Sequence, residues 1–116
     1  MKVRLRSAQV AEKPEVRGWL SPDECYIVLA IEHLPGKLIA YRIATKQGTP
    51  ALFEASLFVI TDPRVSAVWV VQYSDSGDIN LVPEPWCTPG FWEDFFDGHP
   101  DAIERYHEVL RREPSV

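Results

Sequence analysis

This sequence is poor in cysteine, in long apolar runs and in positive charge. Its two cysteines, Cys25 and Cys87, match neither a CxxC pair nor a zinc-ligand spacing. We therefore expect two free thiols in a reducing compartment, with Cys25 buried as a small apolar residue. No apolar run reaches the roughly 18 residues of a membrane-spanning helix, and the N-terminus lacks the apolar segment of a signal peptide. The sequence predicts a cytoplasmic protein with no membrane partner.

The shortage of Lys and Arg limits the kinds of partner. Twelve basic residues stand against 17 acidic residues, which gives a formal net charge of -5. Nucleic-acid binding depends on basic side chains that neutralise phosphates, so this balance argues against a nucleic-acid partner. An acidic protein instead suits a basic partner, which it attracts by long-range electrostatics.

The motifs of the common enzyme classes are missing as well. The sequence has no GxGxxG, Walker, GxSxG or HExxH pattern. Cys87 is followed by His99 and His107, but no nucleophile motif surrounds them. Asp97, His99 and Asp101 alternate across a turn, and an acid at that place also suits a helix N-terminus without any metal. We therefore expect no enzyme activity, no cofactor and no metal.

The composition is that of a globular domain. Hydrophobic residues make up 46% of the chain and charged residues 25%, which are ordinary values for a folded protein. A chain of 116 residues is long enough to bury one core without disulfides or metal. We expect a single domain over residues 1–116.

Alternating and apolar runs predict a series of strands. Residues 2–6 alternate between basic and apolar side chains, which is the period of a half-buried strand. The run 27–31 is apolar on both faces, which predicts a central strand covered on both sides. Pro35 and Gly36 fit the central positions of a type II turn. The predicted strands are residues 2–6, 25–33, 38–45, 56–60, 66–73 and 78–82.

Residues 51–60 are ambiguous between strand and helix. Thr49 and Pro50 resemble a helix N-cap followed by proline at the first helical position. The run 57–60 is short, β-branched and aromatic, which is typical of a strand. We favour a strand over residues 56–60.

The last third of the chain changes to a helical period. Thr88 and Pro89 resemble a helix cap and first turn, Gly98 a helix end, and Pro100 a second helix start. The rings predicted to share the inner side of the first helix are Phe91, Trp92, Phe95 and Phe96. The residues predicted to share the inner side of the second are Ile103, Tyr106, His107 and Leu110.

Strands followed by helices predict an α+β fold. We expect a mostly antiparallel sheet of about five or six strands, with two short C-terminal helices packed on one face. The second face of the central strand then lacks an obvious cover. A homodimer is the simplest way to supply one.

Two carboxylates interrupt the apolar strands. Glu32 and Glu54 need a partner if they are buried, and Arg42 in the next strand is the expected one. A cross-strand ion pair is the favoured interpretation. A small ligand-binding or hydrolase pocket beside these residues is the alternative.

Residues 83–101 combine aromatic rings with acids. The segment has five aromatic residues, five carboxylates and no Lys or Arg. Rings provide buried area and carboxylates bond Lys and Arg, which together form the usual centre of an interface with a basic partner. With most rings packed inward, the acids remain as an exposed stripe, and Trp86 is expected at the surface. The predicted partner-binding residues are Glu84, Trp86, Glu93, Asp94, Asp97 and Asp101.

With these features the chain resembles the small acidic immunity proteins of bacterial polymorphic-toxin and contact-dependent growth inhibition systems. The resemblance rests on a short α+β chain without catalytic motifs and on the Trp-rich segments 85–86 and 91–98. It implies a non-enzymatic, one-to-one inhibitor of a cognate toxin, often a nuclease or another basic protein. It implies no catalytic residue. The alternative is a self-associating accessory domain of unknown role.

Overall fold

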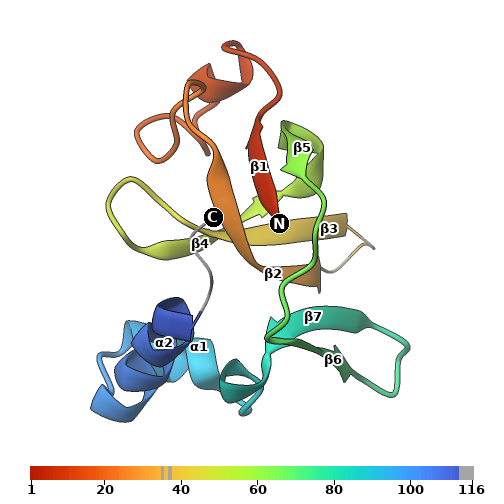
Figure 1. Cartoon of the computed structure of the whole chain (residues 1–116), viewed down its shortest axis with the longest axis vertical. Coiled ribbons are helices and arrows are strands. Elements are labelled where there is room, and N and C mark those ends of the chain that lie inside the picture. The colour runs from red at the N-terminus through yellow and green to blue at the C-terminus, as the bar shows by residue number, and fades with distance from the viewer. Residues whose placement is uncertain (35, 37, 113–116) are drawn as a thin grey trace. The chain divides into compact units, whose positions relative to one another are not determined.

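The structure is a computed structural model, and it describes residues 1–34, 36 and 38–112. The chain divides into two compact units, Met1–Val65 and Ser66–Val116 (Figure 1). The described residues form antiparallel strands followed by two C-terminal helices, so the predicted α+β class is confirmed. The single domain over residues 1–116 stays a prediction.

The first unit is an antiparallel sheet in which the strands follow the order β4-β3-β2-β1-β5 (Figure 1). Its strands are β1 (Lys2–Leu5), β2 (Tyr26–Leu34), β3 (Leu38–Ala44), β4 (Pro50–Glu54) and β5 (Phe58–Asp62). The alternation in β1 buries Val3 and Leu5 and exposes Arg4, as its sequence period predicts.

The middle of β2 is buried on both faces. Val28, Leu29 and Ala30 follow one another and are all buried, which confirms the predicted central strand. This part of β2 therefore offers no exposed apolar face to a second subunit. The loop before β2 contains the 3-10 helix η1 (Val10–Glu12) and adds three buried apolar side chains. These are Ala11, Val16 and Leu20.

The ambiguous region 51–60 contains two strands with a helical turn between them. β4 ends at Glu54, the 3-10 helix η2 (Ala55–Leu57) follows, and β5 begins at Phe58. The favoured strand over 56–60 is thus correct only from Phe58 onward. The alternative, a helix capped at Thr49–Pro50, is excluded, because Pro50 is the first residue of β4, a position where its missing N–H is tolerated.

The turn between β2 and β3 is described only at its glycine. Gly36 has φ +86°, the left-handed conformation that a type II turn requires. Pro35, the other central residue of the predicted turn, lies outside the described residues.

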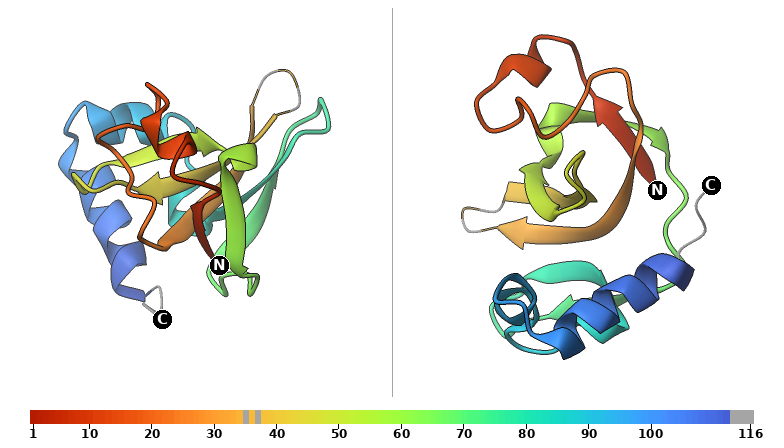
Figure 2. Two further views of the ribbon diagram at one scale, coloured as in Figure 1. Left: turned by 90° about the horizontal axis from the view of Figure 1, so that it is seen from above. Right: turned by 90° about the vertical axis from the view of Figure 1, so that its left-hand side faces the viewer.

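The second unit consists of a hairpin, a helical turn and two helices. Its elements are β6 (Trp69–Tyr73), β7 (Ile79–Pro83), the 3-10 helix η3 (Glu84–Trp86), α1 (Phe91–Phe96) and α2 (Pro100–Arg112). The predicted hairpin is confirmed, with Gly77 in its turn at φ +91°. Figure 2 shows α2 leading away from α1 toward the C-terminal end. None of the described helices is long and apolar enough to cross a membrane.

The inner side of α2 differs from the predicted one. Ala102, Tyr106 and Val109 are buried, whereas His107 is exposed. At about 100° per residue His107 lies at the edge of the predicted arc, about 40° beyond Ile103. Packing of Tyr106 against the aromatic residues of η3 and α1 turns the helix away from that arrangement.

Candidate partner-binding surface

A buried cluster of aromatic rings holds the second unit together. Trp86 is 2% exposed, and its ring stacks on Phe91 at 6.1 Å and on Tyr106 at 5.3 Å between centroids. Its indole Nε1 donates a hydrogen bond to the carbonyl oxygen of Arg105 at 3.2 Å. Buried indole N–H groups usually have such a partner. The expected surface position of Trp86 is therefore wrong, because the ring fixes η3 against both helices and is not available to a partner.

A glycine sets where α1 begins. Gly90 precedes the helix with φ +76°, a left-handed conformation that glycine adopts without steric cost. The chain turns at this point, so the first helical residue is Phe91 and the predicted cap at Thr88–Pro89 is wrong. The predicted end is confirmed, since Gly98 follows the last turn with φ +82°.

Three of the four aromatic residues of α1 face inward. Phe91 is buried, and Trp92 and Phe95 are half-buried, with their centroids 6.1 and 4.8 Å from that of Tyr106. Phe96 is 55% exposed, which contradicts the prediction that it packs inward. A short helix that packs mainly on one neighbouring helix cannot bury rings spread over so wide an arc.

The outer side of α1 combines three carboxylates with this exposed ring. Glu93, Asp94 and Asp97 are exposed, and at 100° per residue they fall with Phe96 within an arc of about 160°. We term these four residues the α1 acidic face. His99 lies at its edge, with Nε2 4.0 Å from Oδ1 of Asp94. Within the described ranges, no Lys or Arg forms an ion pair with these three carboxylates.

The charge of the chain is unevenly divided between the two units. Ser66–Val116 holds ten of the 17 acidic residues and three of the 12 basic ones, a net charge of -7. Met1–Val65 holds the remaining seven acidic and nine basic residues, a net charge of +2. The acidic field thus belongs to the unit that carries α1.

Two of the predicted binding residues are placed apart from the α1 acidic face. Asp101 is on α2, where Arg105 forms an exposed ion pair with it at 3.0 Å. The same Arg105 donates to Thr88 Oγ1 at 3.0 Å. Glu84 is exposed at the start of η3. The six predicted residues therefore do not form one site. Three of them, Glu93, Asp94 and Asp97, belong to the α1 acidic face.

Glu84 instead borders a shallow pocket within the second unit. The pocket has a volume of about 480 Å³. Its lining residues are Ala67, Val68, Val70, Glu84, Pro85 and Arg112. The walls are mostly apolar, with one acid and one base. Such a lining does not indicate a particular class of ligand.

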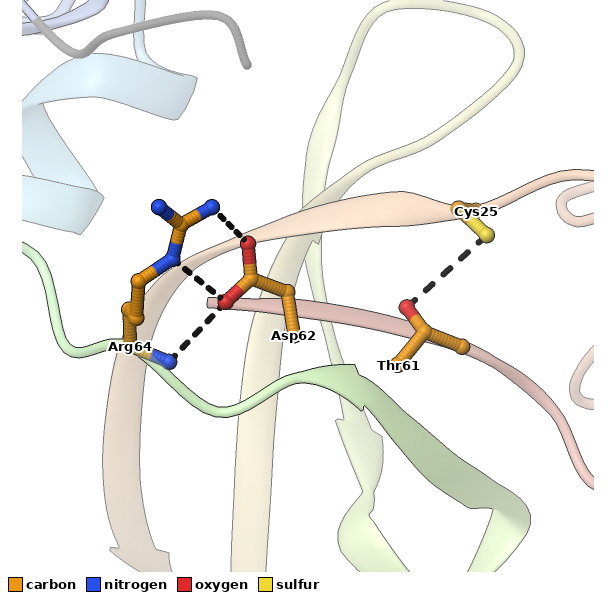
Figure 3. Close-up of polar contacts among 4 residues, drawn as sticks. All are labelled: Cys25, Thr61, Asp62 and Arg64. Atoms are coloured by element: carbon orange, nitrogen blue, oxygen red, sulfur yellow. Dashed lines mark hydrogen bonds and ion pairs between the residues drawn. The ribbon is translucent and has the colours of Figure 1, made fainter.

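The two cysteines occupy different environments. Cys25 is exposed, which contradicts its expected burial, and the Thr61 hydroxyl donates to its Sγ at 3.8 Å (Figure 3). Cys87 is half-buried, and its thiol donates to the Pro83 carbonyl oxygen at 3.6 Å. Burial raises the pKa of the Cys87 thiol above its ordinary value, and the charge of Glu84 adds to the effect. A raised pKa disfavours a nucleophilic role for Cys87.

We expect iodoacetamide to alkylate Cys25 faster than Cys87 in the folded protein at pH 8. The thiolate is the reactive form, and its fraction at Cys87 is lowered by the raised pKa and its access by burial. Peptide mass spectrometry at timed intervals measures both rates. The ratio of the two alkylation rates is expected to approach one as the pH rises through the pKa of Cys87 and to reach one in denaturant. Equal rates in the native protein would contradict the two environments.

An ion pair ends the last strand of the first unit. Arg64 donates to Asp62 through Nε at 3.0 Å and through a terminal guanidinium nitrogen at 2.6 Å (Figure 3). These hydrogen bonds, with one from the Arg64 backbone, hold the pKa of Asp62 well below its usual range. Asp62 therefore stays ionised and paired, and we assign it a structural role.

The candidate hydrolase residues form a structural ion pair. Nε of Arg42 lies 2.7 Å from Oε2 of Glu32, and both side chains are largely buried, so the predicted cross-strand pair is confirmed. Glu54 is exposed and lies apart from this pair. Across residues 1–34, 36 and 38–112, no group of three or more His, Cys, Asp or Glu residues is arranged to hold a metal ion.

Sequence reasoning missed the exposed Phe96. The wheel contained a signal, because Phe96 lies at the edge of the apolar arc, one helical turn from Glu93.

No family model, curated protein or solved structure matches this chain.

Proposed function

We propose that this protein is a non-enzymatic inhibitor of the immunity type, which binds and neutralises a basic toxin through the α1 acidic face. One observation carries the proposal. Phe96 is exposed at one end of the arc that also holds exposed Glu93 and Asp97, on a helix whose other side is fixed by the buried rings around Trp86. An exposed ring beside exposed acids suits a basic protein surface, because the ring offers apolar contact area and the acids bond Lys and Arg.

The arrangement suits tight binding because little has to be ordered when the partner arrives. The ring cluster already holds α1, so its carboxylates keep their positions without a further loss of conformational freedom. Phe96 provides apolar area, and the carboxylates accept charge-assisted hydrogen bonds from Lys and Arg. The net charge of -7 on this unit accelerates the encounter with a basic partner.

The resemblance to small acidic immunity proteins supports a cytoplasmic setting for this interaction. In the proposed setting the protein is cytoplasmic, and each cell's own copy binds the toxin one-to-one and protects that cell. The paired Asp101 and the pocket residue Glu84 are secondary in this proposal, since each lies off the α1 acidic face.

Charge reversal on the α1 acidic face is expected to abolish protection. We predict that a strain lacking this gene is inhibited in co-culture by its parent, and that the wild-type gene restores growth. The triple variant E93K/D94K/D97K is expected to lower affinity for the toxin at least about 100-fold and to fail in this assay. The matched control is E12K/E15K, which reverses two exposed acids in the first unit and is expected to protect normally.

The same variants test the chemistry in solution. Binding of the purified toxin by the wild-type protein is expected to weaken as salt rises, and the triple variant to lose most of that dependence. Protection by E93K/D94K/D97K equal to wild type would show that this surface is not the interface. A deletion strain that grows normally beside its parent would refute the immunity role itself.

A further inference from the structure

The outer strand of the second unit's hairpin has an edge at Val71 and Tyr73 with which no described strand pairs. β6 pairs with β7 along one side in the register Trp69–Pro83 through Tyr73–Ile79, and among the described residues β7 is its only strand partner (Figure 1). Its side chains are well exposed at this edge, with Val71 at 55% and Tyr73 at 78%. An edge of this kind presents backbone groups that a further strand can bond.

The register shows which backbone groups point outward. Ser74 N–H donates to the Asp78 carbonyl oxygen at 3.2 Å. Because every second residue of an antiparallel strand bonds the same neighbour, the backbone groups of Gln72 also point toward β7. The backbone N–H and C=O groups of the alternate residues, Val71 and Tyr73, point away from β7. An added strand forms its hydrogen bonds with such outward groups at every second residue.

The devices that usually protect an edge are missing from β6. The strand Trp-Val-Val-Gln-Tyr carries no charge and no proline, and its pairing with β7 has no register shift that would indicate a bulge. Natural sheets rarely leave an apolar edge without one of these features. The edge of β6 is therefore open to a further strand.

We propose that β6 pairs antiparallel with β6 of a second copy of this chain, about a two-fold axis at Val71. The sequence of β6 is self-complementary in this arrangement. Val71 faces Val71 of the second copy, and Trp69 faces the second copy's Tyr73 at both ends of the pair. Aromatic cross-strand pairs and a central Val pair stabilise antiparallel sheets. Each Val71 donates its backbone N–H to the carbonyl of the other.

Charge distinguishes a second copy from a basic partner at this edge. β6 has no carboxylate with which to attract Lys or Arg, so it lacks the chemistry of the α1 acidic face. Two units that each carry -7 repel one another, and salt screens that repulsion. Self-association is therefore expected to strengthen as salt rises, whereas toxin binding weakens. The dimer does not depend on the proposed function, and the opposite salt responses separate the two.

Sedimentation of the purified full chain tests the dimer. A five-residue strand pair is a small interface, so we expect a dissociation constant of about 10–100 μM that falls as ionic strength goes from about 0.05 to 0.5 M. V71P removes the outward N–H while leaving the hydrogen bonds to β7, and V71K keeps the backbone but opposes two lysines. Both are expected to weaken the dimer at least tenfold, and V71T to retain it. Circular dichroism and thermal unfolding check that each variant folds.

Disulfide trapping tests the position of the two-fold axis. In a C25S background, V71C is expected to form an intermolecular disulfide, because paired strands bring these residues within bonding distance. The control I79C is about equally exposed, at 53%, but lies on β7 opposite Tyr73, about 20 Å from its counterpart, because three strand spacings across and four residues along the strands separate the two. A monomer at every concentration and salt, a dimer unchanged in both V71P and V71K, or equal cross-linking of V71C and I79C would each overturn the proposal.

Discussion

Replacement of Trp86 by alanine is expected to lower the free energy of unfolding by about 3–5 kcal/mol. The side chain is 2% exposed and stacks on Phe91 and Tyr106, so its removal leaves a cavity between η3, α1 and α2. The Arg105 carbonyl oxygen also loses the hydrogen bond from the indole. Two separate losses therefore add up at one residue.

Urea unfolding followed by circular dichroism measures this effect, and two variants calibrate it. W86F keeps most of the ring stacking but loses the indole N–H, so it is expected to cost less than W86A. F96A removes a ring from the same cluster at a site that is 55% exposed and is expected to cost about 1 kcal/mol or less. A destabilisation by W86A no larger than that by F96A would show that Trp86 does not hold the unit together.

These two rings also separate stability from binding. W86A is expected to impair toxin protection only because α1 loses its support, and lower temperature should partly restore it. F96A is expected to impair protection while leaving the unfolding transition nearly unchanged. The comparison therefore tests whether the exposed ring belongs to the interface.

The strands could be predicted from the sequence because their signal is local. Two-residue alternation in β1 and the apolar run in β2 follow from which faces are buried, and both are correct in the structure. The hairpin of β6 and β7 was predictable for the same reason, since Gly77 supplies its left-handed turn residue.

The helical end was less predictable because burial there depends on contacts between elements distant in sequence. Trp86 is buried under the rings of both helices, and one of these, Tyr106, lies twenty positions later in the sequence. Phe96 is 55% exposed because, among the described residues, its ring contacts come from Trp92 and Phe95 of the same helix. A wheel identifies which residues share a side but gives no indication of how wide the covering surface is. The same limit explains the misplaced side of α2.

The acids of the candidate site were predictable as exposed residues, but their grouping was not. Glu93, Asp94 and Asp97 share a short helix, so their proximity follows from the sequence. Asp101 lies near them in sequence but pairs with Arg105 one turn along α2. The open edge of β6 could not be recognised from the sequence, because an edge is defined only by which strands pair.

Replacement of Glu32 by alanine is also expected to cost about 3–5 kcal/mol, because it removes the carboxylate from a buried guanidinium. Arg42 is 6% exposed, and its Nε lies 2.7 Å from the Glu32 carboxylate. The cost comes mainly from the charge left behind, since desolvating a guanidinium without its counter-ion is unfavourable. Replacement of both partners, in E32L/R42M, is therefore expected to recover most of the loss.

Glu54 provides a matched control from the same row of the sheet. Ala40 of β3 pairs with Glu32 on one side and with Glu54 on the other, so both carboxylates extend from equivalent positions on one face. Glu54 is exposed, and E54A is expected to change stability by about 0.5 kcal/mol or less. The four proteins are compared by urea unfolding at neutral pH. If E32A cost no more than E54A, or if E32L/R42M were less stable than E32A, loss of the Glu32 counter-ion from the buried guanidinium would not be the cause.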